Sequence, residues 1–133
     1  RWCLWKDCGS DVLLENERKA ILFSMAHFFD LGLMGLALRI NDTIQAIAVY
    51  EKMNTDTVVV HFEKGSPDFD GIYKAINMET AKRVQQLVPF IDREEDLGMP
   101  GLRQAKMSYQ PDHFIEIYYV LQESLRTTTA SGL

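Results

Sequence analysis

The sequence predicts an α+β fold in which a mixed, mostly antiparallel central sheet is flanked by helices. Apolar residues recur at helical spacing in three separate segments, which indicates three helices. Alternating or β-branched segments lie between and after them, as strands require. Three of the expected strands follow one another directly as a meander, and a purely parallel fold does not begin in this way. With 133 residues, the chain is long enough for one domain and too short for two.

The expected elements follow one another as helix, three strands, helix, strand, helix and strand. Asp11 is the expected N-cap of the first helix, and Gly32 ends that helix. Asn41-Asp42 is a two-residue hairpin signal between the first two strands. The β-branched segment 57–60 fits a central strand. The helices are expected at residues 12–30, 71–87 and 99–109, and the strands at residues 33–40, 43–51, 57–63, 88–92 and 114–121.

Charge and hydropathy exclude some classes of protein. The net charge of −5 argues against a general nucleic-acid surface, which is normally basic. The longest apolar run is only a few residues, so neither a transmembrane helix nor a signal peptide is expected within this sequence. We therefore expect a cytoplasmic protein. Cys3 and Cys8 are expected to be free thiols, with a small disulfide loop as the alternative.

The domain is expected to span residues 1–126, with residues 127–133 as a flexible tail, because the tail is small and polar. The sequence starts at Arg1 and not at methionine. We therefore expect it to be the C-terminal part of a longer protein.

Four short blocks occur in a fixed order along the chain, at residues 61–64, 71–77, 92–98 and 101–111. Together they resemble a bacterial family grouped with the phosphatidylglycerol lysyltransferase C-terminal domain. The resemblance runs from roughly Leu31 to Tyr119. The stretch from Asp92 to Pro111 is its specific part, because it has many residue types at fixed spacing.

This resemblance implies a fold of the GNAT (acyl-CoA N-acyltransferase) type, whose central strands splay apart and admit an acyl donor. It also implies two such units in tandem, as in Fem-type aminoacyltransferases, so an N-terminal GNAT-like unit is the expected partner within the same protein. The best-known relatives move an aminoacyl group from a charged tRNA to a membrane lipid. The expected activity is therefore acyl or aminoacyl transfer, from aminoacyl-tRNA or another acyl donor to a lipid head group or another amine or hydroxyl. Any membrane association would come from other parts of that protein.

One loop departs from the pattern of ordinary GNAT acetyltransferases, which hold a pyrophosphate on a glycine-rich loop before the central helix. Here that position is taken by residues 64–71, where Asp68 and Asp70 would repel a pyrophosphate and Pro67 removes one N–H donor. Acetyl-CoA is therefore the less favoured donor. Two alternatives stay open: a non-catalytic module that binds a ligand or partner, and an acetyl-CoA-dependent N-acetyltransferase.

The candidate catalytic residues are Glu63, Asp92 and Tyr109. Glu63 ends the central strand, where a carboxylate can act as a general base, and Asp92 is the second candidate for that role. Strand alternation places His61 and Glu63 on one face together with Val59, so the two could relay a proton. The resemblance implies Tyr109 as a general acid.

A plain structural role is the alternative for each of these groups. Glu63 would then pair with Lys64 or Arg103, and His61 would be an ordinary core or surface residue.

The remaining candidates would bind substrate. The acidic cluster 92–96 suits an amino group or, through its oxygens, Mg²⁺, although it could instead cap the helix that follows. Arg103 and Lys106 share a helix face that suits a phosphate or a pairing with Asp92 or Glu95. Tyr73 and Asn77 lie one turn apart on the second expected helix, and their side chains would either orient a ligand or face the sheet. The full set of substrate-binding candidates is His61, Lys64, Tyr73, Asn77, Glu94, Glu95, Arg103 and Lys106, and no metal site is expected.

Overall fold

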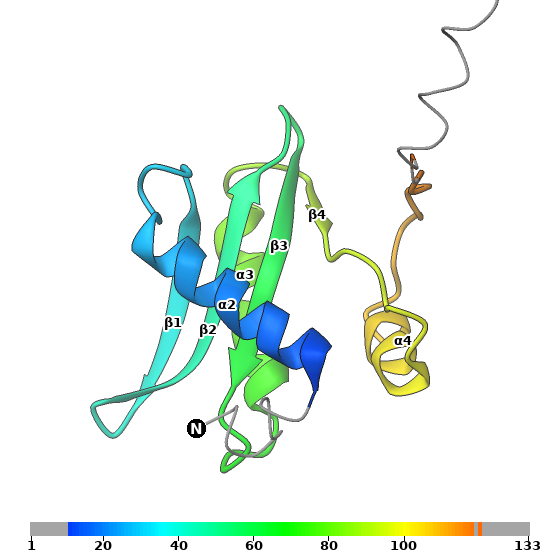
Figure 1. Cartoon of the computed structure of the whole chain (residues 1–133). Coiled ribbons are helices and arrows are strands. Elements are labelled where there is room, and N and C mark those ends of the chain that lie inside the picture. Colours follow the sequence, from blue (N-terminus) through cyan, green and yellow to red (C-terminus); the bar gives the residue numbers. More distant parts are fainter. Residues whose placement is uncertain (1–10, 119, 121–133) are drawn as a thin grey trace, which may run out of the picture. The chain divides into compact units, whose positions relative to one another are not determined.

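The computed structural model describes residues 11–118 and 120 of the chain (Figure 1). Cys3, Cys8 and the expected tail lie outside these residues. The chain divides into two compact units, residues 1–95 and residues 96–133, and each is described by itself. The extent of the domain, residues 1–126, therefore remains a prediction.

A four-stranded sheet with the order β1-β2-β3-β4 forms the first unit. Helix α2 crosses one face of this sheet, and helix α3 packs along the other (Figure 1). The β1–β2 and β2–β3 pairs are antiparallel and the β3–β4 pair is parallel, which confirms the mixed, mostly antiparallel sheet. The elements are α2 (Val12–Ala26), β1 (Met34–Ile40), β2 (Thr43–Lys52), β3 (Thr57–Gly65), α3 (Ile72–Val84) and β4 (Phe90–Asp92).

Helix α2 begins where its cap was predicted. The Asp11 carboxylate accepts hydrogen bonds from the N–H groups of Leu13, at 2.8 Å, and Leu14, at 3.4 Å. The helix ends at Ala26, four residues before the predicted end, and turns carry the chain to Gly32 at φ 67°. No residue of α2 is buried.

The hairpin turn between β1 and β2 also matches its prediction. Asn41 and Asp42 have φ values of 49° and 60°, the left-handed pair that a type I′ turn requires. Asparagine and aspartate tolerate this conformation better than most residues. The local sequence therefore determines the register at this end of the sheet.

The hydrophobic core lies between the sheet and α3. It is built from alternate residues of β2 and β3 together with one face of the helix. Gly65, at the end of β3, permits the close approach of α3, since a Cβ there would lie 2.6 Å from Cγ2 of Ile72. The buried members of this cluster are Ala46, Ala48, Tyr50, Val58, Val60, Ile72, Ile76, Val84 and Val88.

The described part of the second unit contains α4 (Pro100–Met107), with proline in the first turn as predicted. The predicted strand at 114–121 is wrong for the residues that are described, because residues 114–118 and 120 are not in a strand. Phe114 and Tyr118 are 76% and 79% exposed. Alternating side chains show only that a segment fits a sheet surface, and a strand also needs a partner for its backbone groups.

Candidate functional site

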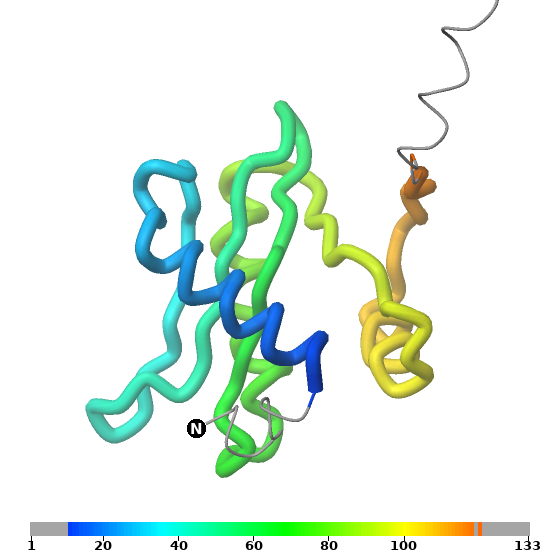
Figure 2. Tube along the Cα trace, viewed as in Figure 1, coloured from blue at the N-terminus to red at the C-terminus, as the bar shows by residue number. Residues whose placement is uncertain are grey.

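The sheet opens between β3 and β4. Their parallel ladder has three pairs, from Thr57 with Phe90 to Val59 with Asp92. Beyond it β3 continues to Gly65, while the chain after Asp92 turns away from β3 (Figure 2). We call this opening, between residues 60–65 of β3 and residues 93–95, the β3–β4 gap. On the gap side, the backbone groups of residues 60–65 lie beyond the ladder with β4.

A β-bulge in β3 decides which side chains share a face. Tyr50 pairs with Val60, but its neighbour Val49 pairs with Phe62, so His61 is an extra residue. Tyr50 and Ala48 lie on one face of β2, and their partners Val60 and Glu63 therefore share the α3 face.

Val59, opposite Glu51, lies on the other face of the sheet. The prediction that Val59, His61 and Glu63 share a face is thus wrong, because one extra residue shifts the alternation by one position. The predicted relay between His61 and Glu63 loses its geometric basis.

On the α3 face, three elements meet at Arg93. Nη2 of Arg93 donates to Oε2 of Glu63 at 3.0 Å. The Asn77 amide, on α3, faces the same guanidinium, and with its oxygen turned toward Arg93 it accepts a hydrogen bond from Nη2 at 2.8 Å. The side chains of Arg93 and Glu63 are only 24% and 12% exposed. Oε1 of Glu63 has no hydrogen-bond partner among the described residues. The arrangement thus fixes the Glu63 carboxylate at the gap through one of its two oxygens.

On the opposite face, His61 lies between two carboxylates. Its Nε2 is 3.0 Å from Oε1 of Glu51, on β2, and its Nδ1 is 2.9 Å from Oε1 of Glu94. Burial alone would lower the pKa of His61, but the hydrogen bonds and charges of Glu94 and Glu51 outweigh it and raise that pKa above the usual value. Because the carboxylates contact different ring nitrogens, the three side chains do not converge on one ion. In the described residues no group of side chains is arranged to hold a metal.

Asp92 shapes the turn that carries these residues. Its Oδ1 accepts the N–H of Glu94 at 2.7 Å, and Glu94 has a left-handed φ of 56°. Asp92 therefore positions Glu94, whereas its predicted role as a base stays untested. Glu95, the next acidic residue, is exposed.

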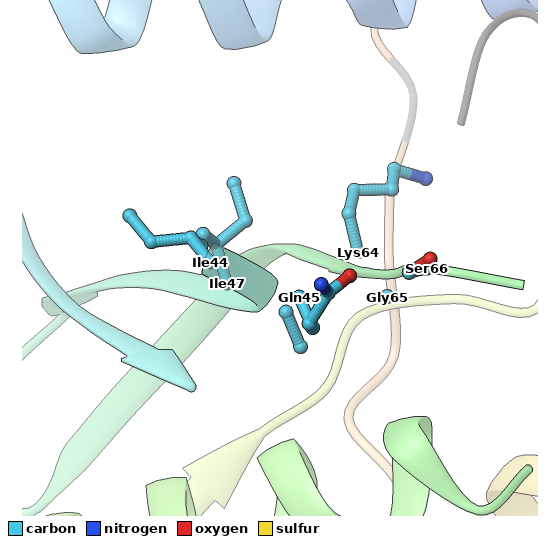
Figure 3. A pocket seen from close by; sticks show the side chains of 7 residues that line it. Ile44, Gln45, Ile47, Lys64, Gly65 and Ser66 are labelled. Carbon is cyan, nitrogen blue, oxygen red and sulfur yellow. The ribbon is translucent and has the colours of Figure 1, made fainter. Parts of the chain in front are cut away.

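Lys64 points to the α2 side of β3, where its Nζ is 2.7 Å from Oε1 of Glu17. It lies beside a shallow, open pocket of about 170 Å³ with mainly apolar walls (Figure 3). Neither predicted partner of Glu63 is therefore its partner in the structure: Lys64 bonds Glu17, and Glu63 bonds Arg93. The pocket is lined by Ile44, Gln45, Ala46, Ile47, Lys64, Gly65 and Ser66.

The loop before α3 closes on itself. The hydroxyl of Ser66 donates to Asp68 at 3.2 Å and accepts the N–H of Asp68 at 3.4 Å. Gly71, at φ 75°, starts α3 without a side-chain cap. Tyr73 lies in the first turn, 40% exposed, with its ring edge next to Gly65. The carboxylate of Asp68 thus belongs to a structured loop beside an uncapped helix end.

The second unit contains the other three candidates. Arg103 forms a two-point ion pair with Asp96, through Nε at 2.5 Å and Nη2 at 3.3 Å. The hydrogen bond from Arg103 is the main reason that the pKa of Asp96 is lowered. The expected alternative partners of Arg103, Asp92 and Glu95, are not its partners. Tyr109, 39% exposed, donates its backbone N–H to the carbonyl of Lys106 at 3.2 Å.

Two residues of this site were not singled out from the sequence. Glu51 is a charged residue directly after the apolar segment 46–50 of β2, which is a weak signal of a specific partner. Arg93 was noted only as a member of the acidic cluster. Its pairing with Glu63, 30 positions earlier, depends on the parallel ladder and has no local signature.

The meander, the crossover helix α3 and a fourth strand that parts from the third together define the class: a GNAT-type acyltransferase fold. The family model for the C-terminal domain of phosphatidylglycerol lysyltransferase matches residues 1–121. The chain belongs to this family, as the sequence resemblance implied.

Three solved structures resemble this chain in fold, and one of them also resembles it in sequence. A conserved protein of unknown function from Bacteroides thetaiotaomicron VPI-5482 is 41% identical, with a TM-score of 0.79; the match covers 84% of this chain and 38% of that one. A ribosomal-protein-alanine N-acetyltransferase from Brucella melitensis biovar Abortus 2308 is 11% identical, with a TM-score of 0.60 and coverage of 75% and 77%. An aminoglycoside N-acetyltransferase in complex with CoA is 11% identical, with a TM-score of 0.56 and coverage of 81% and 90%.

The last two likenesses show the fold alone. A search of curated proteins finds no match. No helix within the described residues combines the length and the apolar composition needed to cross a bilayer.

Proposed function

We propose that this domain transfers an acyl or aminoacyl group to an amine or hydroxyl, with the reaction in the β3–β4 gap. The observation that carries the proposal is the position of Glu63. Its carboxylate accepts a hydrogen bond from Arg93, whose guanidinium is in turn contacted by Asn77, beside the part of β3 that lies beyond the ladder with β4. The favoured donor is an aminoacyl-tRNA and the favoured acceptor a lipid head group or another amine or hydroxyl. These identities rest on family membership.

The chemistry that fits this geometry is a direct attack on the donor's ester carbonyl. The acceptor's N–H or O–H bond breaks as its heteroatom bonds to the carbonyl carbon, and Oε1 of Glu63 takes the proton. Backbone N–H groups on the gap side of β3 would stabilise the developing oxyanion. The ester C–O bond then breaks, and the leaving oxygen takes up the proton that Glu63 received. The expected role of Tyr109 as a general acid stays a prediction.

For the other candidate residues, contacts with the donor or the acceptor remain predictions. Glu94 and Glu95 would attract an amino group, and Arg103 and Lys106 a phosphate. Asp68 and Asp70, beside the start of α3, disfavour the pyrophosphate of acetyl-CoA. An acetyl-CoA-dependent reaction therefore stays the third alternative.

A non-catalytic binding module is the second alternative, and one observation favours it. Two side-chain contacts, Arg93 with Glu63 and Glu94 with His61, already connect the two sides of the gap. A donor that enters the gap must displace or pass these contacts. A module that binds a ligand elsewhere needs no such movement.

A ligand panel followed by one variant tests the proposal. The chain is screened by thermal shift against CoA, acetyl-CoA, amino-acid amides and aminoacyl-RNA mimics. A ligand present at about 100 times its Kd adds about 2.7 kcal/mol to the free energy of unfolding. We expect a shift with an amino-acid amide or an aminoacyl mimic and none with CoA.

Glu63→Gln should then reduce transfer from the bound donor by about 10²- to 10⁴-fold, while the thermal shift by that donor persists. Glu79→Gln is the matched control, because Glu79 pairs with Lys82 on the outside of α3. Glu63→Asp keeps the charge but withdraws the carboxylate, so it should lose transfer and keep the fold. Transfer that survives both Glu63 variants would refute the role of Glu63. A shift only with CoA would support the acetyltransferase alternative.

A further inference from the structure

His61 connects two segments that the sheet does not join by itself. The ladder between β3 and β4 ends at Val59 and Asp92, and beyond it side chains of the next residues contact β3. On the α2 face, Glu94 reaches Nδ1 of His61, while Nε2 of the same ring is bound by Glu51 from β2. The imidazole thus bridges the middle of the sheet and the segment after β4.

We propose that His61 is a proton-dependent latch that holds the segment around Glu94 against β3 and keeps the α2 side of the β3–β4 gap closed. Both ring nitrogens face carboxylates. An ionised carboxylate only accepts hydrogen bonds, so both nitrogens must carry a proton for both contacts to form. A neutral imidazole has a single N–H, and one of the two contacts is then lost.

The contact with Glu94 is the one that opens. Glu51 lies within the ten-residue strand β2, where the ladder fixes the backbone on both sides. Glu94 follows a three-residue strand and has a left-handed φ of 56°, an unfavourable conformation for glutamate. Its side chain is 45% exposed, and water can replace the lost contact. Deprotonation of His61 therefore releases Glu94 from His61 on the α2 face, while the Arg93–Glu63 contact on the other face and the sheet stay intact.

The charged groups near His61 favour its protonated form. Glu51 faces it from β2 and Glu94 from the segment after β4. On the same face of the sheet, the cation of Lys64 on β3 is neutralised by Glu17 of α2. Arg93 points to the opposite face, toward Glu63.

The latch closes at low pH. Burial lowers the pKa of His61, but the contacts with Glu94 and Glu51 raise it more, so the pKa in the folded protein lies above the usual imidazole value. Contacts that depend on the proton are then complete below about pH 6.5, the unfolded value, and are lost as the pH rises through the folded pKa.

NMR on the isotope-labelled 133-residue chain tests the latch without any substrate, and so independently of the proposed reaction. The ring signals of His61 are followed from pH 5 to 10, together with the heteronuclear NOE of the Glu94 and Glu95 amides. We expect His61 to titrate above the usual range near pH 6.5. We also expect the amide NOE values of Glu94 and Glu95 to fall with the same midpoint.

Two variants remove one carboxylate each. Glu94→Gln and Glu51→Gln should both lower the His61 midpoint, and Glu94→Gln should also make the amide NOE at position 94 low at every pH. His61→Gln cannot titrate and should abolish the pH dependence of the NOE values. Glu79→Gln, which alters a glutamate on the far helix, should leave both readouts unchanged. The latch would be overturned by a His61 midpoint at or below the usual range. It would also be overturned if the amide NOE values of Glu94 and Glu95 did not change as His61 titrates.

Discussion

The two faces of the β2–β3 sheet are held in different ways. On the α3 face, buried side chains form a continuous core with four buried residues of the helix. On the α2 face, Val49 and Val59 are buried, but α2 itself has no buried residue and reaches β3 through the ion pair of Glu17 with Lys64. Apolar burial supplies most of the folding free energy, so stability should depend mainly on α3.

The comparison also separates stability from chemistry within one strand. Val58 and Val60 of β3 are buried in the core, whereas His61 and Glu63, one to three residues later, are half-buried and bound to charged partners. A rigid, well-packed half of the strand thus positions a polar half at the gap. This is an effective way to hold ionisable groups in a fixed geometry.

The largest expected difference between the faces is in the helices. Ile76 of α3 is fully buried, and Ile76→Ala should lower the free energy of unfolding by about 2–5 kcal/mol through lost burial and a residual cavity. Leu22 of α2 is 55% exposed, and Leu22→Ala should change it by about 0.5 kcal/mol or less. Urea unfolding followed by circular dichroism measures both. Equal losses would mean that α2 packs as tightly as α3, which would contradict the proposed difference in stability between the two faces of the sheet.

A smaller effect is expected where β3 meets α3. In Gly65→Ala the new methyl would lie 2.6 Å from Cγ2 of Ile72, a branched and buried side chain that cannot rotate away freely. We expect a loss of about 1–3 kcal/mol in the free energy of unfolding. Gly101→Ala is the matched control, since a Cβ there meets nothing within 4 Å and alanine favours the helix. If Gly65→Ala were as harmless as the control, α3 would not approach β3 as closely as described.

Local chemistry made most of the fold predictable. The cap at Asp11, the turn at Asn41-Asp42 and the proline at the start of α4 each act within a few residues of their own position. The periodicity of α3 also found its core face, because one helix face is buried along its whole length. The predicted strand at 114–121 failed in its described residues for the opposite reason, since a strand depends on a partner that is often distant in the sequence.

The site was predictable only in part. Glu63, His61 and Glu94 were expected there, but their pairings were not, because a single bulge at His61 turned Glu63 to the α3 face. Such a bulge has no clear residue signature in a β-branched strand. The partners Arg93 and Glu51 are brought in by the ladder, so their roles emerge only from the three-dimensional register.

The smallest expected effect tests whether the core beneath α3 contains a polar partner, such as water, for the buried hydroxyl of Thr80. Thr80 is fully buried on α3, and its Oγ1 has no hydrogen-bond partner among the described residues. An unsatisfied buried hydroxyl is unfavourable, so Thr80→Val should raise the free energy of unfolding by about 1 kcal/mol. Thr80→Ser keeps the hydroxyl and removes the methyl, and it should lower stability by a similar amount. Urea unfolding of both variants gives the sign. A loss of stability in Thr80→Val would mean that the hydroxyl has a partner, such as a buried water, and that the core beneath α3 is not purely apolar.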